Sequence, residues 1–233
     1  MAKNITSVSN LNVVLKAEGV KFSPLGAKAW LVESLNDFNL EAQRKIWFMS
    51  ESILRNDCVE SVIPGVTNLL VIFKQINTDI DFRVQLLLKY WQQAQEVSPD
   101  SKTIEISVCY GGEHAIDLER ICTHSGLSEK EVIKRHYSGN YTVMCVASAP
   151  GFGYLHGLDP MLATPRKTVP SLNMIKGSVT IGGIQTGVAV LTGPNGWNSI
   201  GYADLDMFDS SSSTPSLMGP GDVIKFVPER IEL

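Results

Sequence analysis

Residues 177–187 read GSVTIGGIQTG, an apolar run of Val and Ile whose end is crowded with glycines. A short β-branched run closed by glycines predicts a buried strand that ends in a tight turn. Similar short runs, separated by Gly and Pro, occur at residues 143–147, 178–181, 187–191 and 223–227. Many short strands with regular turn residues between them indicate a β-barrel or a β-sandwich for the C-terminal part of the chain.

The first hundred residues differ, because strand-like and helix-like patterns alternate there. Asn39 is placed to cap a helix that runs to about Arg55, and Thr78 with Asp81 resembles a capping box that opens a second helix. These patterns predict two helices that cover one face of an antiparallel sheet. The strand-like runs that would form this sheet lie at residues 13–22, 27–33 and 59–73.

Ser98-Pro99-Asp100 has the composition of a linker and separates the two kinds of sequence. We therefore expect two domains: a small two-layer α+β domain at residues 1–98 and a β-barrel domain at residues 99–233. The second domain should also contain two short helices, the first ended by Gly126 and the second begun by a capping box at Ser128.

Composition and charge exclude several classes of protein. The chain has 233 residues, 44% of them hydrophobic, and a formal net charge of −4, which argues against a nucleic-acid surface. It has no secretory-type opening and no apolar run of the roughly 20 residues that span a bilayer. Its four cysteines form no C-x-x-C pair and are expected to be reduced thiols rather than zinc ligands. We therefore expect a cytoplasmic protein with no metal-ligating residues of its own and no membrane or nucleic-acid partner, while a requirement for Mg stays open.

Four polar or glycine-flanked positions are candidates for chemistry, each with a structural alternative. Residues 149–155 read APGFGYL. The glycines there either allow the backbone to approach a ligand closely or only form a tight turn of the barrel. Arg166 presents a planar fork of donors that suits a carboxylate or phosphate, but also a surface salt bridge. Gln185 offers the donor and acceptor that an amide- or lactam-reading residue needs. His136 closes a predicted helix, where it is either functional or a hydrogen-bonded structural residue.

Glu113 and Asp117 lie four residues apart near a predicted helix start. They are either a carboxylate pair or residues that cap the helix and compensate its dipole, and capping is the favoured interpretation.

The order of these motifs, more than any one of them, resembles the family of the 5-oxoprolinase B subunits. This family includes the allophanate hydrolase subunit 1 domain and a bacterial inhibitor of a sporulation histidine kinase. The resemblance is dense from about Tyr110 to Val227 and sparser before. In order, its motifs are Cys109-Tyr110-Gly111-Gly112-Glu113, Asp117-Leu118, the helix ending at His136, Pro150-Gly151-Phe152, Tyr154-Leu155, Thr164-Pro165-Arg166, Gly177-Ser178-Val179, Gln185-Thr186-Gly187, Gly196-Trp197 and Ile200-Gly201.

The resemblance implies a small α+β N-terminal domain followed by a mainly-β, cyclophilin-like barrel. It implies one component of an ATP-dependent 5-oxoprolinase, which opens the lactam of 5-oxoproline to glutamate. The expected partners are a larger, cyclophilin-like C-type subunit and a separate A-type subunit, with ATP bound at the partner and the chain inactive alone. The alternatives are a regulatory inhibitor of a histidine kinase and a component of an allophanate hydrolase-type amidohydrolase.

The resemblance also implies site residues. Arg166 is expected to bind an anion, Gln185 to orient the lactam, and His136 to transfer a proton or donate a hydrogen bond. Phe152, Tyr154 and Thr186 are expected to contact the substrate. The sequence departs from the family pattern at two places, so the substrate itself stays open: Val188-Ala189-Val190 replaces the usual Ile-Tyr-Pro, and Tyr202-Ala203-Asp204 replaces the usual Arg-Thr-Pro.

Overall fold

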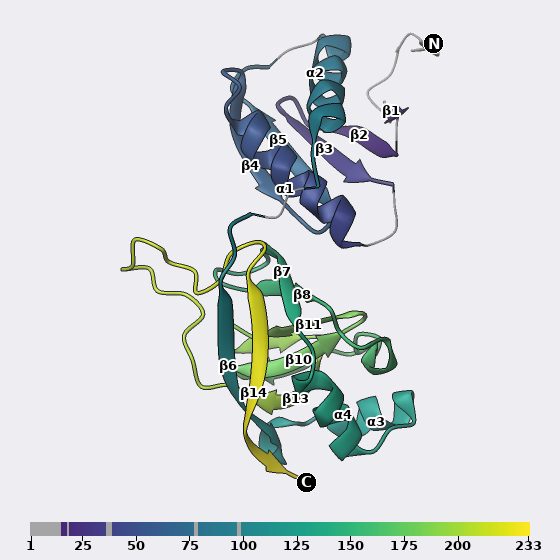
Figure 1. The fold of residues 1–233 in the computed structure, drawn as a ribbon, viewed down its shortest axis with the longest axis vertical. Helices are drawn as coiled ribbons and strands as arrows, with labels where there is room; N and C mark the ends of the chain where they lie inside the picture. Colours follow the sequence, from purple (N-terminus) through teal and green to yellow (C-terminus); the bar gives the residue numbers. More distant parts are fainter. Residues whose placement is uncertain (1–14, 18, 36–38, 77–78, 97–98) are drawn as a thin grey trace. The chain divides into compact units, whose positions relative to one another are not determined.

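The computed structural model describes residues 15–17, 19–35, 39–76, 79–96 and 99–233. The chain forms two compact units, Met1–Ser98 and Pro99–Leu233, each with its own hydrophobic core (Figure 1). None of the described helices is long and apolar enough to cross a membrane.

The first unit is an antiparallel sheet with two helices. Its strand order is β1-β2-β3-β5-β4, and the buried residues alternate along β2, β3 and β5 as the period of a strand requires. Side chains from both helices join one core with these strands, so both helices cover the same face (Figure 1). The elements are β1 (Leu15–Ala17), β2 (Val20–Leu25), β3 (Ala29–Ser34), α1 (Leu40–Leu54), β4 (Val59–Pro64), β5 (Asn68–Phe73) and α2 (Ile80–Gln93).

The helix starts in this unit partly match the sequence. Asn39 caps α1 as expected, because its side chain accepts a hydrogen bond from the backbone of Ala42 at 2.8 Å. For α2 the expected cap is wrong: Asp79 accepts the bond from the backbone of Phe82, one residue later than predicted. Thr78, the expected cap, lies outside the described residues, as do Ser98 of the linker and residues 13, 14 and 18 of the run at 13–22. That run is not the single strand expected, because β1 and β2 pair antiparallel within it.

The second unit contains the expected barrel. Seven strands close in the order β10-β11-β8-β7-β14-β6-β13, and β14 runs parallel to β6 for most of its length (Figure 1). The expected strands at 143–147, 178–181 and 223–227 are confirmed, whereas β8 and β13 were not expected. The barrel strands are β6 (Thr103–Gly111), β7 (Tyr141–Val146), β8 (Gly153–His156), β10 (Ser178–Gly182), β11 (Gln185–Val188), β13 (Asn198–Tyr202) and β14 (Val223–Glu232).

Two helices and a small two-stranded sheet accompany the barrel. The helices are α3 (Leu118–Ser125), which ends at Gly126 in the left-handed region, and α4 (Glu129–Tyr137), which Ser128 caps, both as expected. The small sheet pairs β9 (Ser171–Met174) with β12 (Gly193–Asn195).

The hairpin of β10 and β11 positions the site. Residues 187–191 were expected to form one strand, but β11 instead spans Gln185–Val188, directly after the turn that ends β10. Because side chains alternate across a strand, Thr186 and Val188 point into the barrel core, while Gln185 and Gly187 lie on its outer face. Thus the two neighbours Gln185 and Thr186 serve opposite faces of one strand.

Candidate functional site

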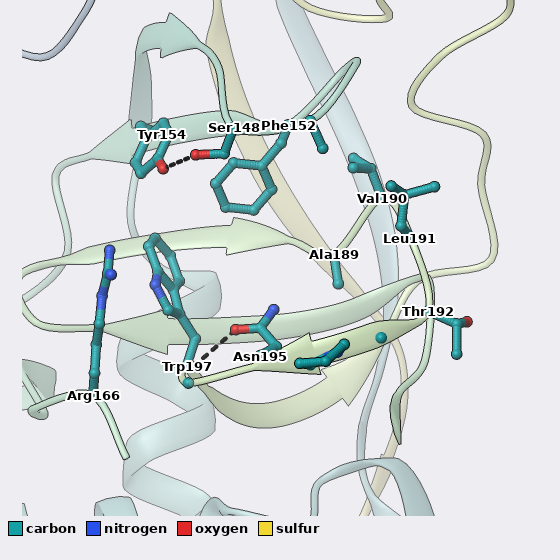
Figure 2. A pocket seen from close by; sticks show the side chains of 14 residues that line it. Ser148, Phe152, Tyr154, Arg166, Ala189, Val190, Leu191, Thr192, Asn195 and Trp197 are labelled. Carbon is teal, nitrogen blue, oxygen red and sulfur yellow. Dashed lines mark hydrogen bonds between the residues drawn. The ribbon is translucent and has the colours of Figure 1, made fainter. Parts of the chain in front are cut away.

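A cavity of about 430 Å³ opens on the outer face of the barrel (Figure 2). This volume lies within the range of small-molecule pockets. The cavity combines aromatic rings, small aliphatic side chains and a single cationic residue. Its lining residues are Ser148, Ala149, Phe152, Tyr154, Arg166, Ala189, Val190, Leu191, Thr192, Gly193, Pro194, Asn195, Gly196 and Trp197.

Three aromatic rings form one wall of the cavity. Phe152 meets Tyr154 and Trp197 edge to face, with ring centroids 5.0 and 5.6 Å apart. The hairpin glycines make room for these rings. A Cβ atom at Gly182 would collide with the Trp197 ring, and one at Gly187 would lie 3.2 Å from the Phe152 ring. The glycines noticed in the sequence therefore shape the outer wall as well as the turn.

Arg166 provides the positive charge of the cavity. Its side chain is exposed, and it forms no ion pair with any residue that the structure describes. The guanidinium carbon lies 5.5 Å from the centroid of the Trp197 ring, close enough for a cation–π contact (Figure 2). The salt-bridge alternative therefore does not apply within the described chain, and the guanidinium is available to an anionic ligand.

Ser148 is a cavity residue that the sequence reasoning missed. Its φ of 67° is in the left-handed region, which is uncommon and costly for a residue other than glycine. Its hydroxyl forms a close hydrogen bond with the hydroxyl of Tyr154 (Figure 2). Nothing in the sequence beyond the adjoining APG turn marks this position, because a serine gives no indication of a positive φ.

Gln185 lies beside the cavity without lining it. It pairs in register with Gly182, the residue on which the Trp197 ring rests, so its side chain leaves the same outer face of the hairpin. Its amide nitrogen is buried and has no hydrogen-bond partner among the described residues. Buried donors without partners are rare, so this amide is a candidate for contact with a ligand.

His136 and Thr186 lie inside the barrel, away from the cavity. His136 is fully buried, and its Nδ1 and Nε2 atoms are each 2.8 Å from a hydroxyl oxygen, that of Tyr110 and that of Thr186 respectively. The Thr186 hydroxyl donates to the carbonyl of Thr180 at 2.9 Å, so it must accept from His136 Nε2–H, and Nδ1 accepts from Tyr110. Every polar atom of this ring is therefore satisfied by the protein.

Burial fixes the protonation of this cluster. It lowers the pKa of His136 to about 3, so the ring is neutral at neutral pH. Burial also raises the pKa of Tyr110, which keeps its hydroxyl protonated as a donor. The neighbouring Tyr141 hydroxyl donates to the backbone carbonyl of His136 at 2.5 Å.

The structure thus separates the six predicted site residues into two groups. Phe152, Tyr154 and Arg166 meet around the cavity, with Gln185 beside them on the outer face of the hairpin. His136 and Thr186 bond to each other in the interior. Their roles stay predictions, but the outer group has the chemistry to hold a small, planar, anionic molecule: an aromatic wall, one unpaired cation and nearby hydroxyl and amide groups.

Comparison with known proteins gives a consistent family. The family model described as carboxyltransferase domain, subdomain C and D, matches residues 20–218. The 5-oxoprolinase B subunit of Escherichia coli O157:H7 is 37% identical over 206 residues, which cover 88% of this chain and 94% of that protein. The 5-oxoprolinase B subunit of Haemophilus influenzae is 34% identical, over 84% of this chain and 91% of that protein.

Solved structures extend the similarity to three dimensions. The conserved uncharacterized protein PH0987 from Pyrococcus horikoshii aligns with a TM-score of 0.53 and 34% identity, over 90% of this chain and 97% of that chain. The structure of TTHA0988 aligns with a TM-score of 0.72 and 27% identity over 87% of this chain. This chain covers only 40% of that longer protein.

Proposed function

This chain belongs to the family of the 5-oxoprolinase B subunits and matches the carboxyltransferase domain of subdomains C and D, and we propose that it serves as the B-type component of a 5-oxoprolinase. The observation that carries the proposal for the site is the unpaired guanidinium of Arg166 beside an aromatic cavity. The substrate that the family name implies, 5-oxoproline, has a small lactam ring with a planar amide group and one carboxylate, which match these two features.

We assign the outer residues to the parts of this substrate. Arg166 binds the carboxylate, because its fork of donors matches the two carboxylate oxygens. Phe152 and Trp197 pack against the ring of the lactam. Tyr154 with Ser148, and the unpaired amide of Gln185, hydrogen-bond the lactam group and fix its orientation, which is how a positioned site lowers the barrier to ring opening.

The interior residues act through the strand that carries Gln185. The neutral ring of His136 holds the Thr186 hydroxyl, and Thr186 is the next residue after Gln185 on β11. We therefore propose a positioning role for this pair, in place of proton transfer by His136 or substrate contact by Thr186. A fully buried, neutral ring with both nitrogens bonded is suited to fixing geometry.

ATP belongs, in this proposal, to the partner side of the enzyme. The described cavity lining contains one cationic side chain, Arg166, so these residues do not by themselves fit a triphosphate. We propose that a larger C-type subunit, with a cyclophilin-like barrel of its own, and an A-type subunit complete the enzyme in the cytoplasm. The barrel of this chain would likewise be cyclophilin-like, following its α+β N-terminal domain, and the chain would be inactive alone.

The test is ATP-dependent release of glutamate from 5-oxoproline. The chain is co-purified with a C-type 5-oxoprolinase subunit, an A-type subunit is added, and matched controls omit each component in turn. Release that requires this chain is the expected result. A stable complex that releases no glutamate would reject 5-oxoproline as the substrate and direct attention to allophanate-type amides. If no complex forms at all, inhibition of a histidine kinase becomes the hypothesis to test.

A further inference from the structure

We propose that the largely buried ion pair of Asp117 and Lys167 is a positioning device that holds Arg166 at the cavity. The inference rests on the proposed function, because it concerns the residue assigned to the substrate carboxylate. Arg166 and Lys167 are consecutive in the chain, yet only Arg166 is left without a carboxylate partner among the described residues.

Lys167 is held more tightly than a surface lysine. Its ammonium lies 2.6 Å from a carboxylate oxygen of Asp117 and 2.6 Å from the hydroxyl of Ser171. The side chains of the pair are only 10% and 12% exposed, so solvent screens the interaction little. The same Asp117 oxygen accepts from the backbone N–H of Ser199 at 2.9 Å, which ties the pair to barrel strand β13.

This use of Asp117 corrects the capping interpretation. Asp117 stands at the N-cap position of α3, but its side chain makes no capping hydrogen bond. The carboxylate instead reaches a lysine 50 residues further along the chain. Asp117 thus has the residue type and position of a helix cap, but its side chain holds the distant segment that contains Lys167.

The backbone on both sides of Arg166 is fixed as well. The carbonyl of Pro165 accepts from the Asn198 amide at 3.1 Å, and the backbone N–H of Lys167 donates to Gly196 at 2.7 Å. Arg166 therefore lies between two anchored residues, although its segment belongs to no helix or strand. With Lys167 directed to Asp117, the free charge of the segment is that of Arg166, directed to the cavity (Figure 2).

The single variant Lys167→Met and the double variant with Asp117→Asn should affect Arg166 in opposite ways. Lys167→Met removes the cation that faces the mostly buried Asp117 carboxylate and leaves the backbone N–H of Ser199 as its remaining donor. Because an uncompensated buried charge is costly, the carboxylate should attract another cation. Arg166 is the residue next to Lys167 and carries the free positive charge of the same segment. It would therefore turn away from the cavity and towards the Asp117 carboxylate. Asp117→Asn combined with Lys167→Met removes the attracting charge, so Arg166 should return.

The first measurement is the arginine side-chain NMR spectrum of the full chain. The ring current of Trp197 should shift the Arg166 resonances, and Trp197→Phe identifies which resonances these are. Lys167→Met should abolish the shift, and the double variant with Asp117→Asn should restore part of it. The control is Lys176→Met, which breaks an exposed Lys176–Asp206 pair elsewhere and should leave the shift intact. An unchanged Arg166 shift in Lys167→Met would overturn the proposal, whatever the substrate proves to be.

The second measurement is selectivity in the reconstituted complex. The ratio of kcat/KM for 5-oxoproline to that for 2-pyrrolidinone, which lacks the carboxylate, should fall about tenfold in Lys167→Met, a coupling within the usual range for neighbouring residues. In an Arg166→Ala background the same change should have no further effect on the ratio. Equal losses for both lactams would mean a merely structural pair and reject the positioning role. If Lys167→Met does not fold, Lys167→Gln, which removes the ammonium but keeps a side-chain donor near Asp117 and Ser171, should lower the ratio in the same direction. An unchanged ratio would count against the proposal.

A wild-type complex that does not open 5-oxoproline would reject the proposed function but not the positioning role of the ion pair. The NMR comparison would still decide whether Asp117 and Lys167 position Arg166.

Discussion

The two sides of strand β11 (Gln185–Val188) border polar groups in opposite hydrogen-bonding states. On the inner face, Thr186 and His136 form a closed cluster in which the protein satisfies every ring nitrogen. On the outer face, the amide nitrogen of Gln185 and the guanidinium of Arg166 have no described hydrogen-bond or ion-pair partner. Satisfied buried groups stabilise a fold, whereas unsatisfied ones retain their capacity for a ligand. Inner substitutions should therefore cost stability, and outer ones should cost function.

The largest expected effect is the loss of the inner cluster. His136→Ala leaves the Tyr110 and Thr186 hydroxyls without their partner and opens a cavity, which should lower the free energy of unfolding by about 3–5 kcal/mol. Urea unfolding of the isolated chain measures it. The exposed His124→Ala is the matched control and should change stability by less than about 0.5 kcal/mol. A small effect for His136→Ala would contradict the closed-cluster description.

Removal of the outer cation comes next. Arg166→Ala should lower kcat/KM for 5-oxoproline about 100-fold in the reconstituted enzyme, because a charge-assisted bidentate hydrogen bond is lost. Its unfolding free energy should stay within about 0.5 kcal/mol of the parent, since the side chain is exposed. Arg166→Lys keeps the charge but not the fork and should be intermediate. Full activity of the alanine variant would remove Arg166 from the site.

The free energy of unfolding should depend on pH because His136 is buried on the inner face of the barrel as a neutral ring. The pKa of His136 is depressed to about 3 in the fold, so the unfolded chain binds the proton more readily. The contribution of His136 is thus complete above the ordinary value of about 6.5 and is lost as pH falls towards 3, at no more than about 1.4 kcal/mol per pH unit. Asp159 and His156, whose pKa values are also lowered, add losses in the same direction. The difference in slope between the parent and His136→Gln isolates the histidine, and equal slopes would argue against its burial as a neutral ring.

The smallest effect concerns the strained residue at the cavity. Ser148→Gly and Ser148→Ala both lose the hydrogen bond to Tyr154, but only glycine relieves the positive φ. Ser148→Gly should therefore be more stable than Ser148→Ala by about 1 kcal/mol. Thermal unfolding of the two variants compares them directly, and equal stability would mean that the left-handed conformation stores no strain.

The sequence predicts the inner architecture better than the outer one. Strand runs and glycine turns depend on local composition, so the barrel and the ends of α3 and α4 could be predicted from it. The short strands β8 and β13 could not, because they are only 4 and 5 residues long and are interrupted by Gly, with Asn and Ser at the start of β13. Their pairing partners rather than their own propensities make them strands.

The polar contacts of the site join residues that are far apart in the sequence, so they depend on the topology of the fold. His136 meets Thr186 across 50 positions of sequence, and Asp117 meets Lys167 across the same separation. Residue type and motif order singled out His136, Gln185 and Arg166, but only the fold assigns the first to the interior and the other two to the outer face. The Ala189 departure from the family pattern likewise acquires meaning only when it is found in the cavity wall.

The most direct test of the division between the two faces uses adjacent residues of β11. Unfolding free energy and ATP-dependent glutamate release are measured for Gln185→Met and Thr186→Val, each in the complete complex and as the isolated chain. We expect Thr186→Val to lose about 1–3 kcal/mol of stability because a buried hydrogen-bond partner disappears. Gln185→Met should be as stable as the parent or more stable, yet lose most of the release rate. A stable, fully active Gln185→Met, or a Thr186→Val that leaves stability intact, would contradict this division between the two faces.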